Sequence, residues 1–176
     1  MQYDEGELDR RELLDSFIRD YGDDLKRIAY LYLNDLAESE DIVQEVLIKS
    51  YHQLDSFRHE SSYKTWLIRM TINQCKDHKK RWSVRNIFYK QEVPEVRDRK
   101  LTETDYIQKE SSNEMLQQLA RLAPKHKEVL ILYYYEELTM QEISDVLQIN
   151  YNTVKSRLLR GKQVLKEKLE RSEGHG

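Results

Sequence analysis

Glycine, proline and cysteine are scarce in this chain of 176 residues, which contains five, two and one of them. Few residues therefore interrupt helices, and no run alternates apolar and polar residues for long enough to indicate a β-sheet. We expect an all-α fold. The single cysteine excludes an internal disulfide. No apolar run suits a signal peptide or a membrane span, so we also expect a cytoplasmic protein.

The chain also lacks the clustered side chains that bind metals. Cys75 and His78 offer only two potential ligands close together in the sequence, whereas zinc takes about four. The neighbouring carboxylates of Asp23 and Asp24 have no histidine at a matching spacing. An enzyme that acts on nucleic acid would need such clusters, so we expect no enzyme, no metal, no other cofactor and no small-molecule substrate.

Acidic and basic residues are segregated along the chain, although the formal net charge is only -3. Residues 1–50 contain 14 acidic and 6 basic side chains, whereas residues 58–90 contain 2 acidic and 9 basic ones. Residues 152–171 form a second basic segment, with 7 basic and 2 acidic side chains. The charge pattern is therefore consistent with two separate contacts with DNA.

The spacing of apolar residues predicts two small helical domains joined by a linker. The first domain, residues 1–81, contains three amphipathic helices, over residues 11–32, 38–54 and 63–81. Residues 82–112 are charged, weakly periodic and contain Pro94, which favours a flexible linker; one more surface helix with a kink is the alternative. The second domain, residues 113–176, should contain four short helices: an apolar segment over residues 115–122, a helix over residues 125–136 and two more after it.

Residues 138–162 predict a helix-turn-helix, two short helices joined by a tight turn. Thr139 and Glu142 have the spacing of a capping box, so the first helix should begin at Met140. Asn150 is suited to cap the second helix.

The second helix of this motif should present a basic face. Val154 and Leu158 lie four residues apart and can pack against the first helix. The other face carries donors for phosphates and base edges in a major groove, namely Asn152, Lys155, Ser156, Arg157, Arg160 and Lys162. An amphipathic helix with an ordinary solvated basic face is the alternative.

A second candidate for DNA binding is the helix over residues 63–81. Its cations and one asparagine form a single stripe, made of Arg69, Asn73, Lys76 and Lys80. The asparagine can bind a base edge while the cations hold phosphates, and Tyr63 and Trp66 could stack on an unpaired base. The alternative is a solvated basic face, with Trp66 in the core.

The order of these segments resembles that of a bacterial protein family. Residues 39–81 resemble region 2 of the extracytoplasmic-function (ECF) sigma factors, and residues 122–169 are similar to their region 4. The resemblance implies a subunit without a catalytic site that binds core RNA polymerase, directs it to promoters and opens the duplex. An autonomous helix-turn-helix regulator, with the first domain used for dimerisation or sensing, is the rival interpretation.

The resemblance also assigns roles to residues. The polymerase-binding face would consist of Asp41, Gln44, Glu45 and Lys49. The loop with His59, Ser61 and Ser62, together with the Asn73 helix, would hold the unpaired minus-10 element. The residues at the double-stranded minus-35 element would be Thr153, Lys155, Ser156, Arg157, Leu159 and Arg160.

Two further expectations come from the family. Its members are usually inhibited by an anti-sigma factor, so we expect such a partner, and the linker would pass through the polymerase channel. Many relatives have glycine where this chain has Gln148 and alanine where it has Ser144. Gln148 should therefore adopt an unusual backbone conformation, and Ser144 adds a polar atom where two helices cross.

Overall fold

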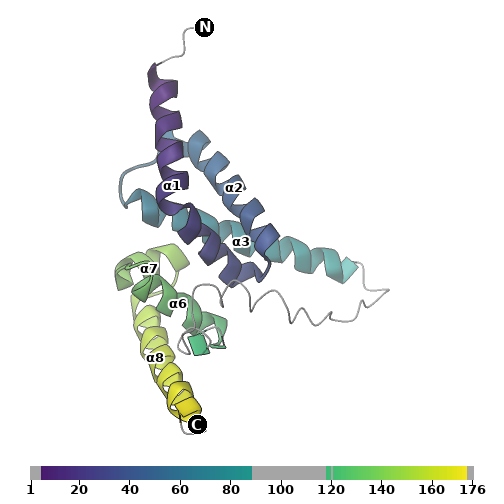
Figure 1. The fold of residues 1–176 in the computed structure, drawn as a ribbon, viewed down its shortest axis with the longest axis vertical. Helices are drawn as coiled ribbons and strands as arrows, with labels where there is room; N and C mark the ends of the chain where they lie inside the picture. Colours follow the sequence, from purple (N-terminus) through teal and green to yellow (C-terminus); the bar gives the residue numbers. More distant parts are fainter. Residues whose placement is uncertain (1–4, 89–117, 120, 174–176) are drawn as a thin grey trace. The chain divides into compact units, whose positions relative to one another are not determined.

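The computed structural model describes residues 5–88, 118, 119 and 121–173. The chain divides into two compact units, Met1–Gln91 and Glu92–Gly176, which are described separately. Every element in the described ranges is a helix (Figure 1). The predicted all-α fold is therefore confirmed.

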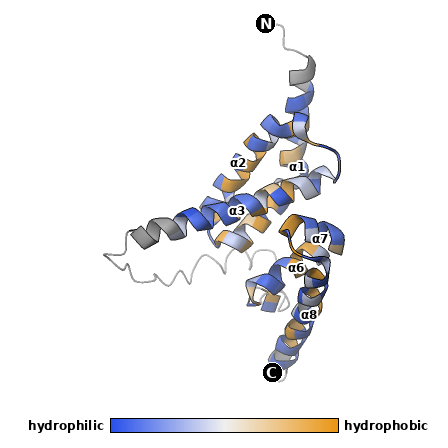
Figure 2. Ribbon diagram, turned by 180° about the vertical axis from the view of Figure 1, so that it is seen from behind, coloured by the Kyte–Doolittle hydropathy of each residue, from blue (hydrophilic) through white to orange (hydrophobic). Residues whose placement is uncertain are grey.

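Unit 1 is a bundle of three long helices, α1 (Glu5–Leu33), α2 (Leu36–Gln53) and α3 (Tyr63–Phe88), with a 3-10 turn, η1 (Leu54–Ser56), after α2. Each of the three helices packs against the other two. Hydrophobic and hydrophilic residues alternate along the three helices, as the colours in Figure 2 show. The fully buried large side chains of this unit are Phe17, Leu25, Ile28, Val46, Leu67, Ile68 and Ile72.

Short polar residues separate these helices. Asn34 adopts a left-handed conformation, with φ 56°, and ends α1. The Asp35 carboxylate accepts a hydrogen bond from the Glu38 amide, at 3.0 Å, and so caps α2. The Ser62 hydroxyl accepts one from the Thr65 amide, at 3.1 Å, at the start of α3.

The helices of unit 1 are longer than their apolar pattern predicted. α1 begins at Glu5 rather than at residue 11, and α3 continues to Phe88 rather than ending at residue 81. No glycine or proline lies in residues 82–88, so nothing in this stretch breaks the helix. The predicted linker thus begins inside α3, and its remaining residues, 89–112, lie outside the described ranges.

Unit 2 contains α6 (Pro124–Tyr134), α7 (Met140–Leu147) and α8 (Tyr151–Glu173). Pro124 takes the first position of α6, where its missing N–H costs no hydrogen bond. α7 and α8 form the predicted helix-turn-helix, and both pack against α6. The buried side chains at the centre of the unit are Val129, Leu132, Ile143, Val146 and Val154.

The capping box at the start of α7 is formed as predicted. The Thr139 hydroxyl accepts from the Glu142 amide at 3.2 Å, and the Glu142 carboxylate accepts from the Thr139 amide at 2.8 Å. Both contacts satisfy amides that the first helical turn leaves without intrahelical partners.

The turn between α7 and α8 depends on a left-handed residue. Gln148 has φ 54° and ψ 45°, which confirms the unusual conformation expected for it. The Ile149 amide donates to the Ser144 carbonyl at 3.1 Å, and the Ser144 hydroxyl donates to the Ile149 carbonyl at 2.6 Å. The polar atom that Ser144 adds is therefore satisfied within the turn itself.

Replacing Gln148 with glycine should stabilise unit 2. A left-handed conformation costs a residue with a Cβ about 1–2 kcal/mol, and the greater freedom of glycine in the unfolded chain removes part of this gain. We expect a net increase of about 0.5–1 kcal/mol in the free energy of unfolding, measured by hydrogen exchange of the α7 amides.

The matched control is Gln163→Gly, which makes the same change at an exposed position inside α8. It should lower the same free energy by about 1 kcal/mol. Equal loss of protection in both variants would show that the turn carries no strain.

Candidate nucleic-acid interface

The exposed face of α8 gathers most of the predicted minus-35 residues. Val154, Leu158 and Gly161 are buried on the opposite side of the helix. The side chains that remain exposed are Asn152, Lys155, Ser156, Leu159, Arg160 and Lys162, while Thr153 is half-buried. Leu159 is 70% exposed, the highest value among the exposed large hydrophobic residues of the described ranges. An apolar group surrounded by cations and short polar side chains suits a base edge that carries a methyl group, such as thymine.

Arg157 does not lie on this face. Its guanidinium Nη1 is 3.3 Å from Glu128 Oε1 of α6, and its backbone carbonyl is 3.2 Å from Nδ1 of His126. The structure therefore separates Arg157 from the other cations with which the sequence grouped it.

Lys162 remains exposed but contacts an aromatic ring. Its ammonium lies 5.4 Å from the centroid of the Tyr134 ring. A hydrogen bond with the Tyr134 side chain, and the charge of that side chain, raise the pKa of Lys162.

The basic stripe of α3 is partly covered by its own unit. Asn73 and Lys80 are exposed, whereas Arg69 and Lys76 are half-buried. Lys76 Nζ lies 6.0 Å from the centroid of the Tyr32 ring, and Arg69 Nε is buried with no hydrogen-bond acceptor within the described residues. Within this stripe, the exposed amide of Asn73 can both donate a hydrogen bond to a base and accept one from it.

The loop before α3 packs around Phe57, a residue that the sequence analysis gave no role. Its ring centroid is 4.7 Å from those of Tyr63 and His59 and 4.8 Å from that of Trp66. Trp66 is half-buried, in line with the alternative that placed it toward the core. No periodic pattern could have pointed to Phe57, because it lies six residues before Tyr63 across a loop, where helical spacing does not apply.

The serines of this loop differ in their surroundings. The Ser62 hydroxyl lies 3.0 Å from the hydroxyl of Thr65 and accepts from its amide, so it is used in capping α3. Ser61 is half-buried. His59 is exposed and has φ 54°, so the backbone turns sharply at the point where the loop projects into solvent.

The predicted polymerase-binding residues of α2 share an exposed face. Asp41, Gln44, Glu45 and Lys49 all have exposed side chains. The Glu45 carboxylate accepts a hydrogen bond from Gln74 of α3 at 2.6 Å, which fixes one charge of this face. Ile48, three residues after Glu45, is 59% exposed. The face therefore contains an apolar group as well as the polar ones that the sequence analysis described.

Family comparisons match both units. The family described as "Sigma-70 region 2" matches residues 17–83, and "Sigma-70, region 4" matches residues 112–165. The ECF RNA polymerase sigma factor SigW of Bacillus subtilis is 31% identical over 159 residues, which cover 85% of this chain and 84% of SigW. The chain belongs to the ECF RNA polymerase sigma factors. Its function is that of a sigma factor in transcription initiation, and it is not an enzyme.

More distant relatives agree with this membership. The RNA polymerase sigma-H factor of Pseudomonas aeruginosa is 26% identical over 148 residues, 79% of this sigma factor and 77% of the relative. Two solved structures share its fold. RpoE of Bartonella quintana, in complex with the anti-sigma factor NepR, has a TM-score of 0.67 at 18% identity and covers 89% of this chain and 96% of its own. CnrH, in complex with the cytosolic domain of CnrY, has a TM-score of 0.61 at 17% identity, and the match covers 92% of this chain and 90% of CnrH.

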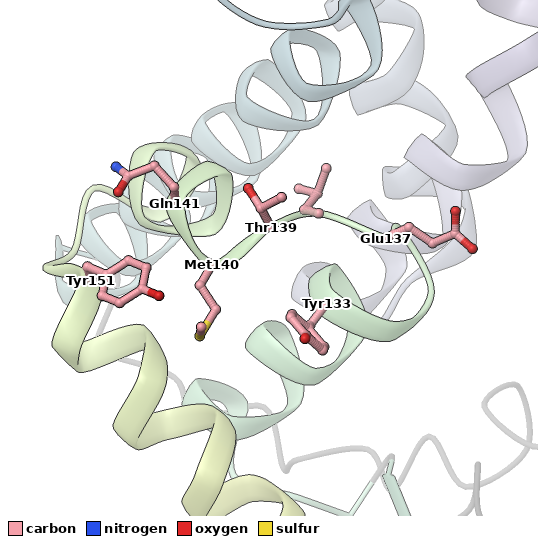
Figure 3. A pocket seen from close by; sticks show the side chains of 7 residues that line it. Tyr133, Glu137, Thr139, Met140, Gln141 and Tyr151 are labelled. Carbon is pink, nitrogen blue, oxygen red and sulfur yellow. The ribbon is translucent and has the colours of Figure 1, made fainter.

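A pocket of about 540 Å³ opens at the start of the helix-turn-helix of this sigma factor. Figure 3 shows Met140 and the rings of Tyr133 and Tyr151 around it, with the Glu137 side chain directed away. Leu138, Thr139 and Gln141 complete the lining. Glu137 is the one carboxylate among these residues, and its side chain points away from the pocket.

The described residues contain no group of three or more potential metal ligands. No described helix is long and apolar enough to cross a membrane. Cys75 is fully buried in the core of unit 1, and burial raises the pKa of its thiol to about 12. A protonated, buried thiol is a poor nucleophile and a poor metal ligand.

Cys75 should therefore resist thiol reagents in the native sigma factor. At pH 8 we expect Ellman's reagent to modify it only when unit 1 opens, whereas the chain unfolded in denaturant should react at once. Because the thiol ionises at lower pH in the unfolded chain, its contribution to stability is complete below about pH 9 and is lost as the pH rises toward 12. Immediate, stoichiometric labelling of the folded protein would contradict this account.

Proposed function

We propose that this sigma factor divides promoter recognition and polymerase binding among three exposed faces. Unit 1, with region 2 over residues 1–81, would bind core polymerase through α2 and the unpaired minus-10 element through α3 and the loop before it. Unit 2, with region 4 over residues 113–176, would read the minus-35 duplex with α8. The observation that supports this division best is the exposed face of α8, where cations surround Ser156 and Leu159.

The division fits the charges of each face. The backbone of DNA is polyanionic, so affinity comes from the cations, while sequence preference comes from polar and apolar contacts with base edges. α8 offers both kinds of group on one side. Among its described side chains, α3 offers the exposed amide of Asn73 between Arg69 and Lys76, which suits a base that has left the duplex.

The proposal extends to partners and location. RpoE and CnrH, which share this fold, were solved in complex with NepR and with the cytosolic domain of CnrY. We infer that this sigma factor also has an anti-sigma factor and acts in the cytoplasm, where core polymerase is located. The segment between the two regions, residues 82–112, whose first part belongs to α3, would then connect region 2 to region 4 across the polymerase.

Reversing one charge on α2 should weaken polymerase binding. Asp41 is exposed, so Asp41→Lys should leave folding almost unchanged but repel a cationic partner surface. We expect the affinity for core polymerase, measured by fluorescence titration of the labelled sigma factor, to fall by about tenfold or more.

Asp15→Lys provides the control, because it makes the same charge change at an exposed position on α1. It should leave the affinity within about twofold, as expected for a surface charge outside the interface. Equal losses of affinity in the two variants would show a general effect of net charge and would contradict the proposal that the α2 face binds polymerase.

Replacing Asn73 with alanine should separate the recognition of unpaired DNA from duplex binding. The change deletes one base-edge contact and leaves the cations of α3 in place. Binding of holoenzyme to a promoter with a pre-opened minus-10 element should weaken by about 1–3 kcal/mol, while binding to a fully paired fragment with the minus-35 element should not change. Lys80→Ala, the comparison variant, should instead lower the salt dependence of binding. Equal effects of Asn73→Ala on the two DNAs would assign Asn73 to the fold or to duplex binding.

A further inference from the structure

The middle of α8 is held against α6 at very short range. Gly161 of α8 faces α6 so closely that an added Cβ would lie 3.1 Å from Leu130 Cδ1 and 3.3 Å from His126 Cβ. Such contacts are tighter than ordinary van der Waals packing, so a larger residue at this position would require the Leu130 and His126 side chains to shift by a few tenths of an ångström. At this close range, side-chain contacts between α8 and α6 help to determine how α8 is rotated about its own axis.

An ion pair makes that connection one turn before Gly161. Arg157 Nη1 lies 3.3 Å from Glu128 Oε1, and the side chains are only 27% and 18% exposed. His126 adds a contact of 3.2 Å between its Nδ1 and the Arg157 carbonyl. Both the side chain and the backbone of Arg157 are thus held by α6.

This placement is unsuited to a contact with DNA. To bind a phosphate, the Arg157 guanidinium would have to break its ion pair with Glu128, and the half-buried Glu128 carboxylate would then repel the phosphate. The neighbouring cations, Lys155 and Arg160, are exposed and require no such exchange.

We propose that Arg157 is a positioning residue, which through Glu128 fixes the orientation in which α8 presents Lys155, Ser156, Leu159 and Arg160 to the minus-35 element. The inference rests on the proposed reading of DNA by α8. A binding site must hold its side chains to within about 0.5 Å, and a half-buried ion pair between two helices supplies such a constraint. The sequence alone grouped Arg157 with the DNA contacts because both roles require a cation.

Exchanging the two charges distinguishes the roles. Holoenzyme is assembled with each of three variants, Arg157→Glu, Glu128→Arg and the double exchange, and its affinity is measured on the preferred minus-35 sequence and on a scrambled one. Each single variant places two like charges together and should reduce the preference about three- to tenfold, the range for a partly buried pair. The double exchange restores an ion pair and should recover the preference to within about twofold.

A direct contact with phosphate requires the opposite results. Glu128→Arg would then strengthen binding, because it removes a carboxylate and adds a cation. The double exchange would not recover the original affinity, because it keeps a carboxylate at position 157. Either result overturns the inference. Arg157→Ala adds a second measurement: the slope of log affinity against log salt should stay unchanged, whereas loss of a phosphate contact would lower it by about one.

Two controls complete the experiment. Hydrogen exchange of the α7 amides shows whether unit 2 is folded in each variant; a double exchange that refolds the unit but does not restore the preference counts against the inference. Arg160→Ala should reduce the preference without disturbing the ion pair. If Arg160→Ala has no effect on any sequence, the proposed reading of DNA by α8 fails, whatever the charge exchange shows.

Discussion

The close approach of α8 to α6 at Gly161 decides which side chains of unit 2 face the solvent. With the side of α8 formed by Val154, Leu158 and Gly161 buried, the opposite side has to carry the charged and polar residues. The left-handed Gln148 sets the direction in which α8 leaves α7, and the capping box at Thr139 sets where α7 begins. The geometry of the exposed face thus follows from one helix crossing and two local backbone features.

Unit 1 combines an acidic face on α2 and a basic face on α3 in a single small bundle. Its core is apolar, and polar contacts between helices lie around it. Gln74 of α3 donates to Glu45 of α2 at 2.6 Å, and Lys26 of α1 is 2.5 Å from Glu40 of α2. These contacts keep the α2 carboxylates in place while leaving Asp41 exposed. The acidic and basic segments of the sequence therefore lie on different helices, which pack against each other in the same bundle.

Much of the fold could be predicted because its signals are local. The capping box, the break at Asn34 and the helical spacing of apolar residues each depend on residues a few positions apart. The start of α1 was missed because residues 5–10 contain a single apolar residue, Leu8. The end of α3 was missed because residues 82–88 were grouped with the charged segment that follows them, although Val84 and Ile87 have helical spacing. Among the site residues, Arg157 could be separated from Lys155 only once its partner on α6, Glu128, was known. The spacing gave a partial signal, because Arg157 lies three residues after Val154 and four before Gly161, on the buried side of the helix. The packing of Tyr63 and Trp66 on Phe57 depends on a loop conformation with His59 in a left-handed region, which no periodic pattern reveals.

The division into two units has a consequence for how the chain acquires its structure. In unit 1, α1, α2 and α3 contact one another within the first 91 residues, and in unit 2, α6, α7 and α8 are consecutive helices. Helices that pack on their neighbours in sequence give a low contact order, and such domains fold in microseconds to milliseconds. Translation adds only about 5–20 residues per second, so unit 1 can complete its core on the ribosome before α8 has been synthesised. The proposed polymerase-binding surface on α2 would then form before α8, the proposed reader of the minus-35 element, has been synthesised.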